Sequence, residues 1–219
     1  LINYTGHGSS LSCASSGYNS SDVNQLTNTD VHPFFWSVAC VNGDFTDITC
    51  FAETWLRATH NETGEPTGAI ATLMSTINQS WAPPMEGQDH MNLILTEMSE
   101  SSQSRSFGGI SMNGCMKMND TYGSSGDEMT DTWTCFGDPS LMVRTKVPEN
   151  IEVSYSSNIS VESTSIEVIC PEEDALVSLT QNGEIIGTGI VSEGSANIIF
   201  NDLTSLNQIT VTITASNIF

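Results

Sequence analysis

The stretch PFFWSVAC, residues 33–40, decides the fold of the first half of the chain. A short, continuous apolar run that contains aromatic residues is typical of a strand buried on both faces. LINYT (1–5) and TGAIATLM (67–74) have the same character. The segments between and after these runs predict helices at 21–26 (capped by Ser21), 50–60, 86–98 and 107–123. Strands alternating with helices predict an α/β fold, a mostly parallel sheet with flanking helices.

The composition changes around RTKVPEN, residues 144–150. All five Lys and Arg residues lie at or before Lys146, whereas residues 148–219 contain ten acidic residues and no basic one. Short runs of alternating apolar and polar residues follow, and QNGE (181–184) is a hairpin signal. We therefore predict two domains: residues 1–147, and an all-β immunoglobulin-like sandwich over residues 148–219.

The charge excludes several classes of partner. The chain has 26 acidic against 5 basic residues, a net charge of −21. Such a surface repels nucleic acid, whose binding needs Lys and Arg, and it repels anionic membranes. No apolar run reaches the roughly 18 residues of a membrane span. The acids are scattered, which favours a solvated surface over a specific calcium site.

The six cysteines show no zinc-binding spacing and no CxxC pair. Disulfide pairing and plain burial both remain open for most of them. The methionines of the helix at 107–123, Met112, Met116 and Met118, are expected to fill gaps in the core rather than bind a metal.

Two reactive residues follow two strands in succession. His7 comes after LINYT and Cys40 comes after FFWSVA, 33 positions later. If these strands are neighbours in a parallel sheet, both side chains emerge at the same edge. An imidazole beside a thiol activates it as a nucleophile, and the nearby glycines leave backbone N–H groups open to a substrate carbonyl. Taken alone, Cys40 would be a small buried hydrophobe and His7 a solvated turn residue.

Five segments together resemble the gingipain family of secreted cysteine proteases, and its arginine-specific branch most. They are NYTGHGS (3–9), VACVNGDF (38–45), CFAE (50–53), STINQSWAPPMEGQD (75–89) and DTWTCFGDPSLMVRT (131–145). The match is collinear from residue 1 to about 146. The resemblance implies a caspase-like fold for residues 1–147, of which the chain would hold the C-terminal part. It also implies that the sandwich is the immunoglobulin-like domain that follows the catalytic domain.

The resemblance implies a role for each matching residue. Cys40 would be the nucleophile and His7 the general acid and base, acting through a thioester acyl-enzyme. The backbone N–H groups of Gly8 and Cys40 would form the oxyanion hole. Trp81 and Met85 would line the pocket for a basic side chain, because a cation is attracted to the face of an indole. Without the resemblance, Trp81 would be interpreted as an aromatic residue in a loop.

The resemblance also implies partners that these residues do not supply. The carboxylate that pairs with the substrate's basic group is expected upstream of Leu1, in the rest of the same catalytic domain. No cofactor is required for the chemistry, and the resemblance leaves a structural calcium ion open as an alternative to a solvated acidic surface. The ligands of such an ion are unknown, with Asp44, Asp47 and the acids at 127, 128 and 131 as candidates. Secretion or display at the cell surface is implied.

The function predicted on this basis is a cysteine endopeptidase that cleaves after basic residues, with arginine preferred and lysine accepted. Two alternatives stay open. One is a sortase-like transpeptidase of a secretion system, which passes the acyl group to an amine. The other is a surface or adhesion component whose protease-like half is inactive.

Overall fold

The computed structural model describes residues 1–201, 203 and 205–217. These residues form two compact units, Leu1–Val143 and Arg144–Phe219, and each is described by itself. The division lies close to the composition change that the sequence shows around residues 144–150.

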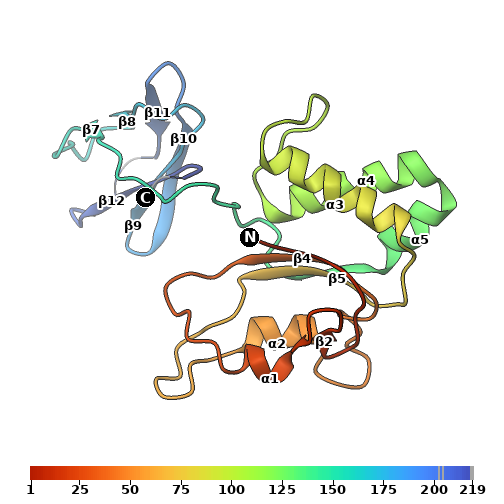
Figure 1. Ribbon diagram of the computed structural model, residues 1–219. Helices are drawn as coiled ribbons and strands as arrows, with labels where there is room; N and C mark the ends of the chain where they lie inside the picture. Colours follow the sequence, from red (N-terminus) through yellow and green to blue (C-terminus); the bar gives the residue numbers. More distant parts are fainter. Residues whose placement is uncertain (202, 204, 218–219) are drawn as a thin grey trace. The chain divides into compact units, whose positions relative to one another are not determined.

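A four-stranded sheet forms the centre of the first unit (Figure 1). Its strands lie in the order β1 (Ile2–Thr5), β4 (Phe34–Val38), β5 (Ala71–Ser75) and β6 (Trp133–Gly137). The first three strands are parallel to one another, and β6 runs antiparallel to β5. The predicted mostly parallel sheet is therefore confirmed, with one antiparallel strand at its edge.

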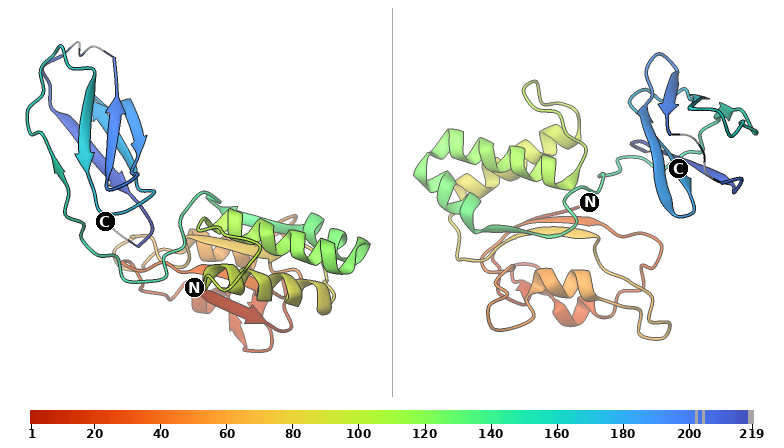
Figure 2. Two further views of the ribbon diagram at one scale, coloured as in Figure 1. Left: turned by 90° about the horizontal axis from the view of Figure 1, so that it is seen from above. Right: turned by 180° about the vertical axis from the view of Figure 1, so that it is seen from behind.

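Helices cover both faces of this sheet, because its central strands are apolar on both faces. Figures 1 and 2 show α1 and α2 on one face and α3, α4 and α5 on the other. Their bounds are Ser20–Val23, Phe51–Arg57, Ala82–Leu95, Phe107–Tyr122 and Ser124–Thr132. Along β4, Phe35 packs toward Phe51 of α2, whereas Phe34 and Trp36 stack on Phe107 of α4. This alternation follows from the two-residue period of a strand.

Three helices begin at residues other than the predicted ones, and for α2 the difference is a single residue, Phe51 in place of residue 50. The helix predicted from residue 86 begins at Ala82, because Pro83 and Pro84 fit the first turn, where no backbone N–H needs a helical partner. The N-cap of α1 is Asn19, not Ser21. The Asn19 side chain accepts the Ser21 N–H at 2.8 Å, and the Asp22 carboxylate accepts the Asn19 N–H at 2.8 Å.

The prediction for the methionines of α4 is wrong for two of the three. Met118 is fully buried, but Met112 and Met116 are 56% and 57% exposed. Met112 and Met116 stand four residues apart, so they share the outer face of α4, whereas Ile110, Gly114 and Met118 face inward. Helix α5, strand β6 and a small hairpin of β2 (Ser12–Cys13) and β3 (Tyr18–Asn19) were not predicted.

The second unit is a sandwich of two three-stranded antiparallel sheets, which confirms the predicted fold. One sheet contains β10 (Glu184–Ile190), β9 (Leu176–Gln181) and β12 (Ile209–Thr214), and the other contains β11 (Ser195–Ile199), β8 (Ser165–Ile169) and β7 (Ser154–Tyr155). Alternate residues of β8, β9 and β11 are buried between the sheets. Asn182 and Gly183 both have positive φ, as the two-residue hairpin turn between β9 and β10 requires.

The six cysteines are free thiols in the structure, and four of them are buried. Of the two alternatives, burial therefore describes Cys13, Cys50, Cys115 and Cys170. Within the described part of the chain, no helix is both long and apolar enough to cross a membrane.

Candidate active site

The site begins where β1 and β4 end side by side. Thr5 is paired with Val38 in the parallel register, and the Gly6 N–H continues the ladder by donating to the Val38 carbonyl at 3.1 Å. His7 and Cys40 each follow two residues after this last pair. The structure therefore confirms that their strands are neighbours and brings both residues to the same edge of the sheet.

Gly8 lies directly against the backbone of Cys40. A Cβ at Gly8 would lie 2.5 Å from the Cys40 carbonyl oxygen and 3.0 Å from the Cys40 nitrogen. It would also lie 2.8 Å from the Cβ of Ala39. Only a residue without a side chain lets the two loops approach this closely. The backbones of Gly8 and Cys40 are thus adjacent, as two donors to one oxygen atom must be.

The loop that carries His7 is fixed through its backbone, which leaves the imidazole available for chemistry. The His7 N–H donates to Ser15 Oγ at 2.9 Å, and the His7 carbonyl accepts the Tyr4 hydroxyl at 2.7 Å. The imidazole meets the indole of Trp81 edge to face, with 5.4 Å between the ring centroids. His7 and Trp81, far apart in sequence, are therefore neighbours.

Helix α3 presents the two predicted pocket residues. Trp81 is its N-cap, and the Met85 N–H donates to the Trp81 carbonyl at 3.2 Å. Trp81 is 48% exposed and Met85 38% exposed, which is high for large apolar side chains. Gln88, one turn further along and buried, anchors the helix. Its amide donates to the Tyr4 and Trp36 carbonyls at 3.2 Å and accepts the Thr5 hydroxyl at 2.6 Å.

Cys40 is half-buried at the start of a strained turn. Its Sγ lies 3.8 Å from the Gln79 carbonyl oxygen. The next residue, Val41, has φ of 50°, a conformation that is unfavourable for a β-branched residue. Two backbone bonds hold the turn: Val41 N–H donates to Ile77 at 3.0 Å, and Gly43 N–H to Ser75 at 2.8 Å.

Asn42 connects the Cys40 turn to the His7 loop, and our sequence analysis did not single it out. Its buried amide group donates to the Ser9 carbonyl at 2.7 Å and to the Ser12 carbonyl at 2.9 Å. It accepts the Ser37 hydroxyl at 2.8 Å. The only signal in the sequence is an Asn-Gly pair directly after a buried strand, which by itself predicts a turn.

Replacement of Asn42 by alanine is expected to lower the free energy of unfolding of the first unit by roughly 3 kcal/mol, because it leaves buried carbonyl and hydroxyl groups unpaired. Urea unfolding followed by tryptophan fluorescence reports on this unit and not on the sandwich, since all four tryptophans of the sequence lie before residue 144. Ser37→Ala, which removes one bond of the same network, should cost about 1 kcal/mol. Equal losses in the two variants would show that Asn42 does not join the loops.

The structure gives the candidate calcium ion no converging set of ligands. Among the described residues, no group of three or more His, Cys, Asp or Glu side chains could hold a metal ion. The Asp44 carboxylate instead accepts the N–H and the hydroxyl of Thr46 at 3.3 and 2.8 Å, a local turn. In the part of the chain that the structure describes, the candidate acids therefore form no cluster of three or more such side chains.

Comparison with known proteins agrees with this geometry. Gingipain R2 of Porphyromonas gingivalis is 46% identical over 219 residues, which cover 99% of this chain and 30% of the relative. Gingipain R1 of the same organism is 44% identical over 218 residues, 99% of this chain and 22% of the relative. The crystal structure of the Arg-specific cysteine proteinase gingipain R matches with a TM-score of 0.94 at 44% identity. That match covers 99% of this chain and 50% of the solved one.

The chain thus spans less than a third of these curated relatives and half of the solved protein. The sequence profile of peptidase family C25 matches residues 1–144, and the profile of the C-terminal ig-like domain of that family matches residues 155–219. These findings confirm the predicted resemblance to the gingipains. This chain is a member of peptidase family C25 that carries the family's C-terminal ig-like domain.

Proposed function

We propose that this chain forms the nucleophile-bearing part of a cysteine endopeptidase that cleaves peptide bonds after basic residues, arginine in preference to lysine. The observation that carries the proposal is the register of β1 and β4, which places His7 and Cys40 at equal positions beyond two paired strands. Membership of family C25 and the likeness to an Arg-specific cysteine proteinase support it.

The reaction proceeds in two steps through Cys40. The thiolate sulfur attacks the substrate's carbonyl carbon, and the carbonyl oxygen becomes an oxyanion that accepts the N–H groups of Gly8 and Cys40. His7 protonates the leaving amine as the C–N bond breaks, which leaves a thioester on Cys40. In the second step, water gives a proton to His7 and attacks the thioester. The C–S bond breaks, and the acid product and the thiolate are released.

Trp81 and Met85 form one wall of the proposed pocket for the basic side chain. The exposed indole offers a face on which a guanidinium group stacks favourably. The carboxylate that pairs with this cation belongs, in our proposal, to another part of the same catalytic domain, because the chain spans only half of the solved relative. The net charge of −21 attracts cationic substrates and is compatible with a secreted or cell-surface enzyme.

Alkylation with an arginyl chloromethyl ketone tests the assignment of the nucleophile in the full-length protein. Of the six cysteines in the sequence, the reagent should label Cys40. Burial raises the pKa of Cys13 to about 12 and that of Cys115 to about 11, and raises those of Cys50 and Cys135 as well, and the Cys170 thiol is buried. Only the thiolate reacts. Peptide mapping by mass spectrometry locates the label.

A matched leucyl chloromethyl ketone serves as the control for the basic pocket and should label Cys40 far more slowly. Absence of label from the folded protein would favour an inactive surface component. Label on another cysteine would show that the nucleophile is wrongly assigned. Product masses with and without an added amine separate hydrolysis from transpeptidation.

A further inference from the structure

The junction between the two units carries two of the five basic residues of the chain, Arg144 and Lys146. Residues 144–148 lie outside any helix or strand, and those from Arg144 to Val147 are exposed. Exposed, irregular segments between compact units are the preferred sites of proteolytic cleavage. An enzyme that cuts after basic residues therefore meets two candidate bonds here, Arg144–Thr145 and Lys146–Val147.

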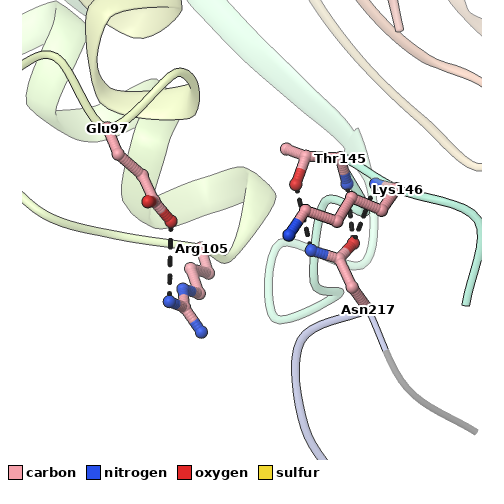
Figure 3. A network of polar contacts seen from close by, with 5 residues as sticks. All are labelled: Glu97, Arg105, Thr145, Lys146 and Asn217. Carbon is pink, nitrogen blue, oxygen red and sulfur yellow. Dashed lines mark hydrogen bonds and ion pairs between the residues drawn. The ribbon is translucent and has the colours of Figure 1, made fainter. Parts of the chain in front are cut away.

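Two of the other three basic residues lie in helices, and the third, Arg105, lies in an exposed segment directly before α4. Lys117 lies inside α4, and Arg57 is the last residue of α2, followed by the buried Ala58. Arg105 forms an ion pair with Glu97 at 3.5 Å (Figure 3). The Arg105 carbonyl accepts the Val143 N–H at 2.8 Å, and the next residue caps α4. The junction is therefore the exposed, irregular segment in which two such bonds lie close together.

One side chain from the end of the second unit holds this segment. The Asn217 Oδ1 atom accepts the Thr145 N–H at 2.8 Å and the Lys146 N–H at 3.1 Å, and the Asn217 Nδ2 atom donates to the Thr145 hydroxyl at 3.0 Å (Figure 3). The Asn217 carbonyl accepts the Glu149 N–H at 3.2 Å. Asn217 has φ of 59°, in the left-handed region that Asn and Gly tolerate.

One of these hydrogen bonds involves the peptide group that would be cleaved. The Thr145 N–H belongs to the Arg144–Thr145 peptide bond, and a protease must draw that bond into its cleft in an extended conformation. We propose that Asn217 is a latch that protects the domain junction, and that release of the latch makes Arg144–Thr145 a site of proteolytic modification. Hydrolysis there consumes one water molecule and leaves a carboxylate on Arg144 and an amine on Thr145. Self-cleavage rests on the proposed function, whereas the protection does not.

Trypsin added to the full-length Cys40→Ala protein tests the latch without relying on the protein's own activity. Asn217→Gly keeps the left-handed backbone but removes all three side-chain bonds, so we expect cleavage at Arg144–Thr145 to accelerate roughly tenfold or more. Asn217→Asp keeps the acceptor for both N–H groups and is the matched control, with cleavage close to that of the parent. Mass spectrometry of the fragments over time identifies the bond and its rate.

Trypsin has no cleavage site in the sandwich itself, because no Lys or Arg follows Lys146. Unfolding of the sandwich is distinguished from local opening by repeating the digestion at low urea concentrations, which accelerate cleavage through global unfolding but leave local opening nearly unchanged. Parental rates for Asn217→Gly, or a strongly urea-dependent rate, would overturn the latch. A further outcome separates the two parts of the proposal. If trypsin cuts Asn217→Gly faster, but the same substitution in the protein with Cys40 intact leads to no self-cleavage, the latch is supported and the proposed self-cleavage is refuted.

Discussion

Replacement of Cys40 by alanine is expected to reduce kcat on a small arginyl peptide substrate by about a millionfold, the loss seen when a covalent nucleophile is removed. In the proposed mechanism, the Cys40 sulfur forms the bond to the substrate. The measurement is the initial rate of the full-length protein.

The structure predicts that this loss is chemical and not a loss of the fold. Cys40 is half-buried, and the hydrogen bond assigned to its sulfur is a weak one of 3.8 Å to the Gln79 carbonyl. The alanine variant should therefore keep the melting temperature of the parent. It should also still bind a peptide alcohol, the non-reactive analogue of a peptide aldehyde inhibitor. Fold and pocket are then intact while turnover is absent.

Cys135→Ala is the matched control. Cys135 is also half-buried, but it lies on β6, paired with Leu73 of β5, and its loss should leave kcat within about twofold of the parent, as for a conservative change away from the site. Retention of more than a hundredth of the activity in Cys40→Ala would refute the assignment of the nucleophile.

The sequence predicted the fold well where the pattern is local. The apolar run of β4 and the alternating runs of the sandwich specify strands. A strand buried on both faces is apolar throughout, and a strand buried on one face alternates apolar and polar residues. The exposure of Met112 and Met116 could not be predicted in this way. A methionine suits a core and a helix surface equally, and the face it occupies depends on how α4 packs on α3.

The site was also predicted only in part, because only some of its features leave a local pattern in the sequence. His7 and Cys40 follow strands, so topology alone brings them to one edge. The strained backbone of Val41 and the buried amide of Asn42 depend on contacts with residues 9, 12, 37, 75 and 77. Such contacts exist only after the loops have met, and a single sequence carries no periodic signal for them. The contact of Trp81 with His7 likewise could not be predicted, because it depends on where α3 packs in the folded unit.

Gly8→Ala is expected to lower kcat/KM by about 10²–10³-fold, the loss typical of a disrupted oxyanion hole. The added methyl group would lie 2.5 Å from the Cys40 carbonyl oxygen and 3.0 Å from the Cys40 nitrogen. Real Cβ atoms do not approach backbone this closely, so one loop must move. The two N–H donors would then no longer converge on one oxygen atom.

Two measurements separate this effect from a loss of folded protein. Active-site titration with the chloromethyl ketone counts competent thiols, so kcat is expressed per site. A peptide aldehyde, whose adduct carries an oxyanion, should lose affinity in proportion to kcat/KM, because the adduct and the transition state use the same donors. Gly189→Ala is the control for the glycine change itself, since its Cβ would meet nothing closer than 3.3 Å. Unchanged aldehyde affinity in Gly8→Ala would show that the Gly8 backbone does not contribute to the oxyanion hole.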